Sequence, residues 1–451
     1  MPSLPARSSW LIFSIVLLHA AGFALTVAVF YPGVMTFDAK YVYSDIATGR
    51  FGDWQSPVMG WLWALVDPIA PGPASIFLVA AASYWLGFGL LSLTLARRST
   101  WLALITPLLA LSPPAFAFVG MIWRDVLFAC AWLLAAVIAF AAVESPATVR
   151  VPAQAIAIGL LVFGVLLRPN AILAAPVLAA YVIWPQRFVI RRAAVLYLPA
   201  IVVLVVAIQV AYYGIFDAMR QKPWASLLVF DLGGITHFTK ENQFPVDWDA
   251  RETALLTSNC YRPALWNVYW NTEPCRFVMD RLEREKIFGS PVLVEAWTGA
   301  VIRHPLAYLR HRAAFMGTFL ADAHLTIWTQ DLDDQTKPIW PDSPAFTALK
   351  TVDAALTPTP FLRIGPWLLL NAAICAWAWR RRYTPASAFA LAVGGSAIAY
   401  VFTFFFVGVA SEFRYALWAV IAGLIGALAS FGKSPPREIE MDARSAVKSL
   451  I

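Results

Sequence analysis

The sequence predicts an all-α integral membrane protein with about ten transmembrane helices and an outer-side (periplasmic) domain. Of the 451 residues, 60% are apolar and only 14% are charged, whereas roughly a quarter of the residues in an ordinary soluble domain are charged. The apolar residues form long runs without Asp, Glu, Lys or Arg, and the basic residues gather in alternate short loops. These features exclude a disordered chain, a nucleic-acid-binding module and a conventional soluble enzyme.

Ten runs without a charged residue are the primary evidence for membrane spans. A helix that crosses the ~30 Å hydrocarbon layer needs about 20 residues, with ~17 as the lower limit. Only Arg168 separates the fifth run from the sixth, so we expect two short helices that meet at one membrane face; a single long kinked helix is the alternative. The runs are Ser8–Phe37, Pro68–Ala96, Ser99–Trp123, Val126–Val143, Val151–Leu167, Pro169–Gln186, Ala193–Phe216, Ile364–Trp379, Tyr383–Ser411 and Tyr415–Gly432.

The distribution of Lys and Arg predicts the orientation, because short cytoplasmic loops carry an excess of cations. With the N-terminus in the cytoplasm, the inner side has 14 cations and four acids, and the outer side has 20 cations and 23 acids. The net charge of +7 therefore indicates topology and not an acidic partner. We expect both termini to be cytoplasmic and the first run to be a retained anchor, since it is too long for the h-region of a signal peptide.

The ten runs, together with the long polar stretch between Phe216 and Ile364, divide the chain into four parts. The long polar stretch is predicted to be a domain outside the membrane, and the other three parts follow from the positions of the spans. The parts are an N-terminal membrane core (1–213) with an outer loop (31–67), an extracytoplasmic domain (214–356), C-terminal transmembrane helices (357–432) and a cytoplasmic tail (433–451).

Cys260 and Cys275 both lie in the predicted extracytoplasmic domain. A disulfide between them would close a loop of about 15 residues and contribute ~3 kcal/mol in the chain-entropy model. An oxidising compartment outside the membrane permits such a bond. We therefore expect a disulfide, with two free thiols as the alternative.

The outer loop after the first run is predicted to contain two surface helices. One begins near Thr36 and places Asp38 in its first turn, where a carboxylate suits the positive end of a helix. Trp54, Trp61 and Trp63 fit an interfacial element, because indole rings favour the headgroup layer.

Three predicted outer turns each present an arginine next to the spans. A charge at membrane depth costs ~2.5–3.5 kcal/mol on insertion scales, so such residues are usually paired or functional. The alternative for each arginine is an anchor that reaches to the lipid headgroups. Because all three turns lie on the same side as Asp38, we favour a shared site. The turns carry Arg124 and Asp125, Arg168 and Asn170, and Arg414 and Tyr415.

These motifs resemble the GT-C superfamily, which comprises multi-span glycosyltransferases that use polyprenyl-phosphate sugars and includes the protein mannosyltransferases and the lipid A aminoarabinose transferases. The resemblance rests on an Asp soon after the first span, an aromatic-rich stretch that ends at a proline before the second span, and the three outer turns. It covers approximately residues 8–213 and, less closely, the last three spans. It implies a GT-C-like fold in the plasma (inner) membrane of a bacterium.

The resemblance also implies roles for single residues. Asp38 matches the aspartate that acts as general base, which takes the proton of an acceptor hydroxyl as the hydroxyl attacks the anomeric carbon. Asp125 matches a second outer acid that orients a substrate or an arginine. Cations are needed where charge develops on the leaving phosphate. The candidate substrate-binding residues are Arg124, Arg168, Asn170, Arg414, Tyr415, Gln55 and Tyr43.

The chain departs from the family in the outer loop. The Asp-Glu pair that is common in the mannosyltransferases is Asp38-Ala39 here, and Gln55-Ser56 replaces the usual His or Lys before the loop proline. The identities of donor and acceptor and the metal dependence are therefore not carried over. No cofactor is indicated, and a divalent metal is the alternative. The acidic segment 331–334 is interpreted as a solvated turn, with a weak cation site as the alternative.

Two other sets of candidate residues lie in the polar stretch. Arg303 and Arg310 are seven residues apart, so they are predicted to share one face of a helix. They could hold the phosphate of a lipid carrier, although a membrane-surface anchor is the favoured interpretation. The histidines have no metal-ligand spacing and receive no role; those of the polar stretch are His237, His304, His311 and His324.

The resemblance thus implies a glycosyltransferase that moves a sugar from a polyprenyl-phosphate donor to an extracytoplasmic lipid or cell-envelope glycan acceptor. Its partners are the lipid bilayer, the donor and the acceptor, and no nucleic acid is expected. The alternative is a transporter or flippase of lipid-linked saccharides. Such a protein is expected to carry polar residues near the bilayer midplane or to have two similar halves, whereas the charges here gather on one face.

Overall fold

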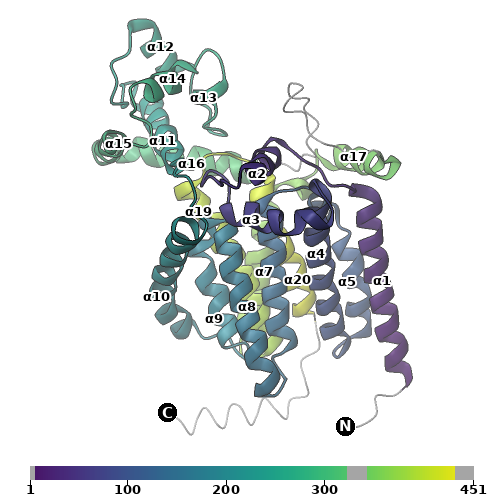
Figure 1. The fold of residues 1–451 in the computed structure, drawn as a ribbon. Helices are drawn as coiled ribbons and strands as arrows, with labels where there is room; N and C mark the ends of the chain where they lie inside the picture. Colours follow the sequence, from purple (N-terminus) through teal and green to yellow (C-terminus); the bar gives the residue numbers. More distant parts are fainter. Residues whose placement is uncertain (1–5, 322–342, 432–451) are drawn as a thin grey trace.

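The computed structural model describes residues 6–321 and 343–431, and the regular elements of these residues are all helices (Figure 1). Seven helices are long and apolar enough to cross a membrane. They are α1 (Ala6–Phe30), α4 (Pro73–Ala96), α7 (Arg124–Ala141), α8 (Ala147–Leu167), α10 (Ile190–Gln209) with its π-helical continuation Val210–Ile215, α19 (Pro385–Val407), and α20 (Leu417–Ser430) with the preceding 3₁₀ turn η5 (Phe413–Ala416).

The other three apolar runs form shorter or broken helices. α5 (Thr100–Ala110) and α6 (Pro113–Val119) are bent by 58° at their junction and would make an eighth span together. α9 (Ala175–Ile183) has only 9 residues and α18 (Ile364–Trp379) has 16. The structure therefore shows an all-α membrane protein with seven to eight candidate spans, and it does not confirm the predicted count of about ten.

The chain between the fifth and sixth apolar runs breaks at Arg168. This residue ends α8 with φ −135° and ψ 87°, outside the helical region, as expected for a residue that precedes a proline. A 3₁₀ turn, η2 (Pro169–Leu173), leads from it to α9. The two runs are therefore separate helices, as predicted, and not one kinked helix.

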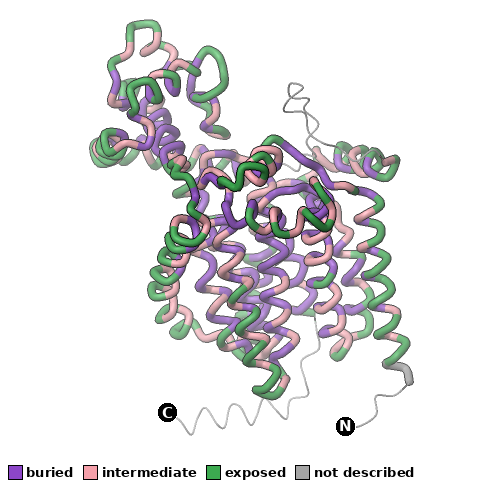
Figure 2. The backbone as a smooth tube through the Cα atoms, in the orientation of Figure 1, coloured by how far each residue is buried: buried purple, intermediate pink, exposed green. Residues whose placement is uncertain are grey.

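The core of the bundle surrounds α7 and α20. In each of these spans, 78% of an 18-residue apolar stretch is buried inside the protein, compared with 6% of such a stretch in α10. Figure 2 shows the same contrast, with buried residues concentrated in the central helices and exposed ones along α1 and α10. Because apolar side chains cover the outer helices, lipid is their expected solvent.

One end of the bundle, called the site end below, is covered by helices that lie across it: α2 (Phe37–Thr48), α3 (Pro57–Val66) and α17 (Pro344–Leu356) (Figure 1). Thr36 is the N-cap of α2, and Asp38 lies in its first turn. The two predicted surface helices of the first loop are thus present. At the opposite end, Arg98 pairs with Glu144 at 3.1 Å.

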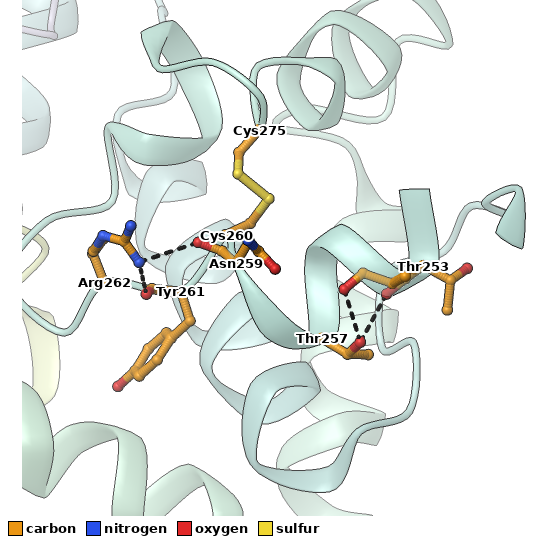
Figure 3. Close-up of a disulfide and its surroundings, with 8 residues drawn as sticks. Thr253, Thr257, Asn259, Cys260, Tyr261, Arg262 and Cys275 are labelled. Carbon is orange, nitrogen blue, oxygen red and sulfur yellow. Dashed lines mark hydrogen bonds between the residues drawn. A yellow bond between two sulfur atoms is a disulfide. The ribbon is translucent and has the colours of Figure 1, made fainter. Parts of the chain in front are cut away.

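Residues 224–321 form a unit at the site end, called the 224–321 unit. Cys260 and Cys275 are joined by a disulfide, and Arg262 donates hydrogen bonds to the carbonyls of Asn259 and Tyr261 beside it (Figure 3). The last helix of the unit contacts α18 and α19 of the bundle. The helices are α11 (Trp224–Thr239), α12 (Ala250–Ser258), α13 (Val268–Asn271), α14 (Phe277–Arg284), α15 (Pro291–Arg303) and α16 (Pro305–Ala321).

The structure corrects one prediction in this unit. Arg303 ends α15, and Arg310 belongs to α16, because the helix stops at His304 and Pro305 begins a new one. Proline favours the first turn of a helix and is unfavourable in its interior. The two arginines therefore do not share the face of one helix. His324 and the acidic segment 331–334 lie outside the described residues.

Candidate functional site

Three arginines and three carboxylates meet at the site end, and we call them the charged cluster. They come from turns that are far apart in the sequence. Asp38 and Glu412 both pair with Arg414, at 2.8 Å and 2.5 Å. Arg168 pairs with Asp125 at 2.7 Å. The cluster consists of Arg124, Arg168, Arg414, Asp38, Asp125 and Glu412.

The Asp38–Arg414 pair joins the first outer loop to the last turn. Trp123 fixes the start of α2, because its indole N–H donates a hydrogen bond of 2.8 Å to the Thr36 hydroxyl. The same indole ring lies beneath the Arg414 guanidinium, 4.6 Å from its Cζ atom. One tryptophan thus supports both partners of the pair.

The Asp125–Arg168 pair is buried, with side-chain exposures of 4% and 6%. The Arg168 guanidinium lies over the Tyr415 ring at 4.7 Å, and the Tyr415 hydroxyl accepts a hydrogen bond of 3.3 Å from Arg414. Tyr415 therefore connects the two ion pairs, and an arginine that stacks on an aromatic ring and binds a carboxylate is held in one orientation.

Arg124 differs from the other two arginines. Its Nη1 atom donates a hydrogen bond of 3.3 Å to the carbonyl of Trp54, and its side chain is half-buried. Within residues 6–321 and 343–431, no carboxylate lies at ion-pair distance from it. Arg124 is therefore the cation of the cluster that is best placed to receive an anionic ligand.

The two carboxylates that pair with Arg414 have opposite electrostatic environments. Burial would raise the pKa of the Asp38 carboxyl, but the charges of Arg414, Arg124 and Arg168 lower this pKa below its ordinary value. The pKa of Glu412 is raised, because burial outweighs the attraction of Arg414. Asp38 is thus kept ionised, whereas Glu412 is closer to protonation, and this kind of separation is typical of sites with acid–base chemistry.

The remaining predicted residues lie outside the ion pairs. Tyr43 packs on Trp63 with 5.0 Å between ring centroids and donates to Asp67 at 3.5 Å; its hydroxyl is thus engaged near α3. Gln55 lies next to Ser56, the N-cap of α3, and is half-buried. Asn170 lies in η2 and is also half-buried.

Sequence reasoning did not assign a role to Glu412 or Trp123. Glu412 lies two residues before Arg414 in the sequence, and this short spacing was the signal that could have identified it. Trp123 precedes Arg124 directly and carried no signal of its own. The structure places both in contact with Arg414.

A second polar cluster lies buried in the 224–321 unit. Asp231 of α11 pairs with Arg312 of α16 and lies 3.3 Å from His311, and all three side chains are fully buried. The indole N–H of Trp297 donates to the second oxygen of Asp231 at 2.8 Å. Burial lowers the pKa of His311, so the imidazole is held neutral while Asp231 and Arg312 carry the charges.

This second cluster is connected to the turn that carries Glu412 and Arg414. Arg312 donates a hydrogen bond of 2.7 Å to the carbonyl of Gly408, where α19 ends. Backbone bonds also join the two regions, from Trp266 to Val409 at 2.9 Å and from Ser411 to Ala264 at 2.7 Å. The 224–321 unit therefore positions the chain directly before Arg414.

Among the described residues, no group of three or more His, Cys, Asp or Glu side chains is arranged to hold a metal ion. The six members of the charged cluster are three arginines and three carboxylates. Arginine N–H groups suit an anionic ligand, which can take over their hydrogen bonds.

No family model and no curated protein matches the chain. Among solved structures, the chain is similar to ArnT from Cupriavidus metallidurans bound to undecaprenyl phosphate, with 14% sequence identity and a TM-score of 0.33. The similarity covers 94% of this chain and 78% of that chain.

Proposed function

We propose that the chain is a membrane glycosyltransferase that moves a sugar from a polyprenyl-phosphate donor to an extracytoplasmic lipid or cell-envelope glycan acceptor. The observation that carries this proposal is the charged cluster, in which three arginines and three carboxylates meet where apolar helices end. A polyprenyl phosphate has an anionic head on an apolar chain. Arginines bind phosphate through paired N–H donors, and the lipid chain can remain among the apolar helices.

In the proposed reaction, an acceptor hydroxyl attacks the anomeric carbon of the donor sugar. The bond from this carbon to the phosphate oxygen breaks, and the phosphate keeps the electron pair. Asp38 takes the hydroxyl proton, as a carboxylate within hydrogen-bond reach can do. Arg124 binds the phosphate first, because it has no carboxylate partner within the described residues, and Arg168 and Arg414 stabilise the charge that develops on the leaving group.

Within this proposal, each remaining member of the charged cluster positions another residue. Asp125 holds Arg168, to which it is paired at 2.7 Å. Glu412 holds the Nε atom of Arg414 at 2.5 Å. Asn170, Tyr415, Gln55 and Tyr43 remain proposed contacts of the substrates.

Replacing Arg124 with Gln should weaken the binding of undecaprenyl phosphate by about 10- to 150-fold, because hydrogen bonds to charged groups contribute ~1.5–3 kcal/mol. The dissociation constant is measured with the protein in lipid nanodiscs. Arg98→Gln is the control, since Arg98 pairs with Glu144 at the opposite end of the bundle, and it should bind the lipid as the wild type does. Equal binding by the two variants contradicts a phosphate site at Arg124.

We further propose that the site end faces the outside of a bacterial inner membrane and that both termini are cytoplasmic. The basic loops of the opposite end and the disulfide of the 224–321 unit support this orientation. The four-part division, with an extracytoplasmic domain at 214–356 and a cytoplasmic tail at 433–451, follows from it. Alkaline phosphatase fused after Asp125 should be active, and fusions after Arg98 or Arg192 should be inactive. The reverse pattern contradicts the proposed orientation.

A further inference from the structure

Three tryptophans form an aromatic cluster next to the charged cluster. Trp54 belongs to the loop between α2 and α3. Trp266 lies two residues before α13, and Trp270 lies within this helix. The ring centroids are separated by 5.1 Å for Trp54 and Trp270, 5.2 Å for Trp266 and Trp270, and 6.0 Å for Trp54 and Trp266. Each ring therefore contacts the other two, and we call the three residues the tryptophan cluster.

Two backbone groups of the tryptophan cluster form hydrogen bonds, one with the charged cluster and one with the turn that carries Glu412 and Arg414. The carbonyl of Trp54 accepts the hydrogen bond of Arg124. The backbone N–H of Trp266 donates to the carbonyl of Val409, three residues before Glu412. The tryptophan cluster thus lies beside the arginine that is best placed to receive a phosphate.

The indole N–H groups of the tryptophan cluster are available to a ligand. Trp63, Trp123 and Trp297 each donate their indole N–H to an oxygen of the protein. The indole N–H groups of the tryptophan cluster make no hydrogen bond within the described part of the chain. Trp266 is buried, but Trp270 is 40% exposed. The cluster therefore offers the exposed part of the Trp270 indole together with unused N–H donors.

We propose that the tryptophan cluster binds the sugar ring of the polyprenyl-phosphate donor, which is an inference that rests on the proposed function. A pyranose ring has an apolar C–H face and hydroxyl groups around its edge. An indole offers a matching apolar face and one N–H donor. Because the sugar is bonded directly to the phosphate, a phosphate at Arg124 places the sugar next to the residues around Trp54.

The test compares undecaprenyl phosphate with undecaprenyl-phosphate-linked glucose as probes in nanodiscs. Glucose is suitable because its hydroxyls are equatorial and both ring faces are open to stacking. The wild type should bind the glucose lipid about three- to tenfold more tightly, which is the factor that one aromatic contact contributes. Trp270→Ala should lose this difference and keep the affinity for undecaprenyl phosphate, whereas Trp270→Phe should keep part of it.

Trp224→Ala is the matched control, since Trp224 is 45% exposed at the start of α11 and is not a member of the tryptophan cluster. This variant should retain the preference for the glucose lipid. Equal binding of both lipids by the wild type, an unchanged preference in Trp270→Ala, or an equal loss of both lipids in that variant overturns the sugar site. A wild type that binds neither lipid contradicts the proposed function as well, so the two failures are distinguishable.

Discussion

Replacing Asp38 with Asn should slow sugar transfer by about 10²- to 10⁴-fold, the usual contribution of a general base. The amide keeps the size of the side chain and can still accept the hydrogen bond of Arg414, but it cannot take up the acceptor proton. The binding of undecaprenyl phosphate should therefore change little. The measurement is the transfer rate at saturating donor, with donor binding recorded on the same preparation.

Asp45→Asn is the matched control for this variant. Asp45 belongs to the same helix as Asp38, and its carboxylate accepts a hydrogen bond from the backbone of Gly52. We expect this variant to transfer sugar at the rate of the wild type. A folded Asp38→Asn protein that retains full activity would remove Asp38 as the base.

The pH dependence of the rate separates Asp38 from Glu412. Because neighbouring arginines lower the pKa of Asp38, this carboxylate stays ionised above the ordinary Asp pKa of ~3.9. The wild-type rate should therefore stay level as the pH falls toward this value and decline only below it. The pKa of Glu412 is raised, so a decline that begins above the ordinary Glu pKa of ~4.3 assigns the titrating role to Glu412 instead.

Replacing Arg312 with Met should lower the free energy of unfolding by about 3–5 kcal/mol, the cost of removing one partner of a buried ion pair. The variant leaves the buried Asp231 carboxylate without its arginine and the Gly408 carbonyl without its donor. Both losses are costly, because water cannot reach either group. Unfolding by denaturant in detergent, followed by circular dichroism, provides the measurement.

Arg310→Met is the control for the change in charge and shape. Arg310 lies in the same helix, two residues earlier, and its side chain is exposed, so its replacement should leave the free energy of unfolding nearly unchanged. The double variant Asp231→Leu with Arg312→Met should recover part of the loss, since it removes both charges. An Arg312→Met protein as stable as Arg310→Met contradicts the structural role of the ion pair.

Local signals in the sequence predicted several elements that the structure contains. Thr36 and Asp38 indicated the start of α2, and Arg168 before Pro169 indicated the break between α8 and α9. These features depend on residues that are neighbours in the sequence, so they can be predicted from it. The number of spans could not be read in the same way, because hydropathy does not tell how much of an apolar run is helical.

The contacts of the charged cluster depend on tertiary structure and could not be predicted. Asp38 and Arg414 pair although they are 376 residues apart, and nothing in the sequence says which acid contacts which arginine. The Asp231–Arg312 pair was also missed, because charged residues in a polar stretch are expected to face water. Helix packing buries them instead, and only the structure shows this.

The fate of the lipid carrier tests the central claim most directly. The wild-type protein is reconstituted in vesicles with a polyprenyl-phosphate-linked sugar and a lipid extract of bacterial envelopes, and the free polyprenyl phosphate is quantified by mass spectrometry. A glycosyltransferase releases free polyprenyl phosphate and leaves the sugar on an acceptor, and Asp38→Asn should release little of it. Movement of the intact sugar lipid to the other leaflet, without release of free carrier, would contradict the account and identify a transporter.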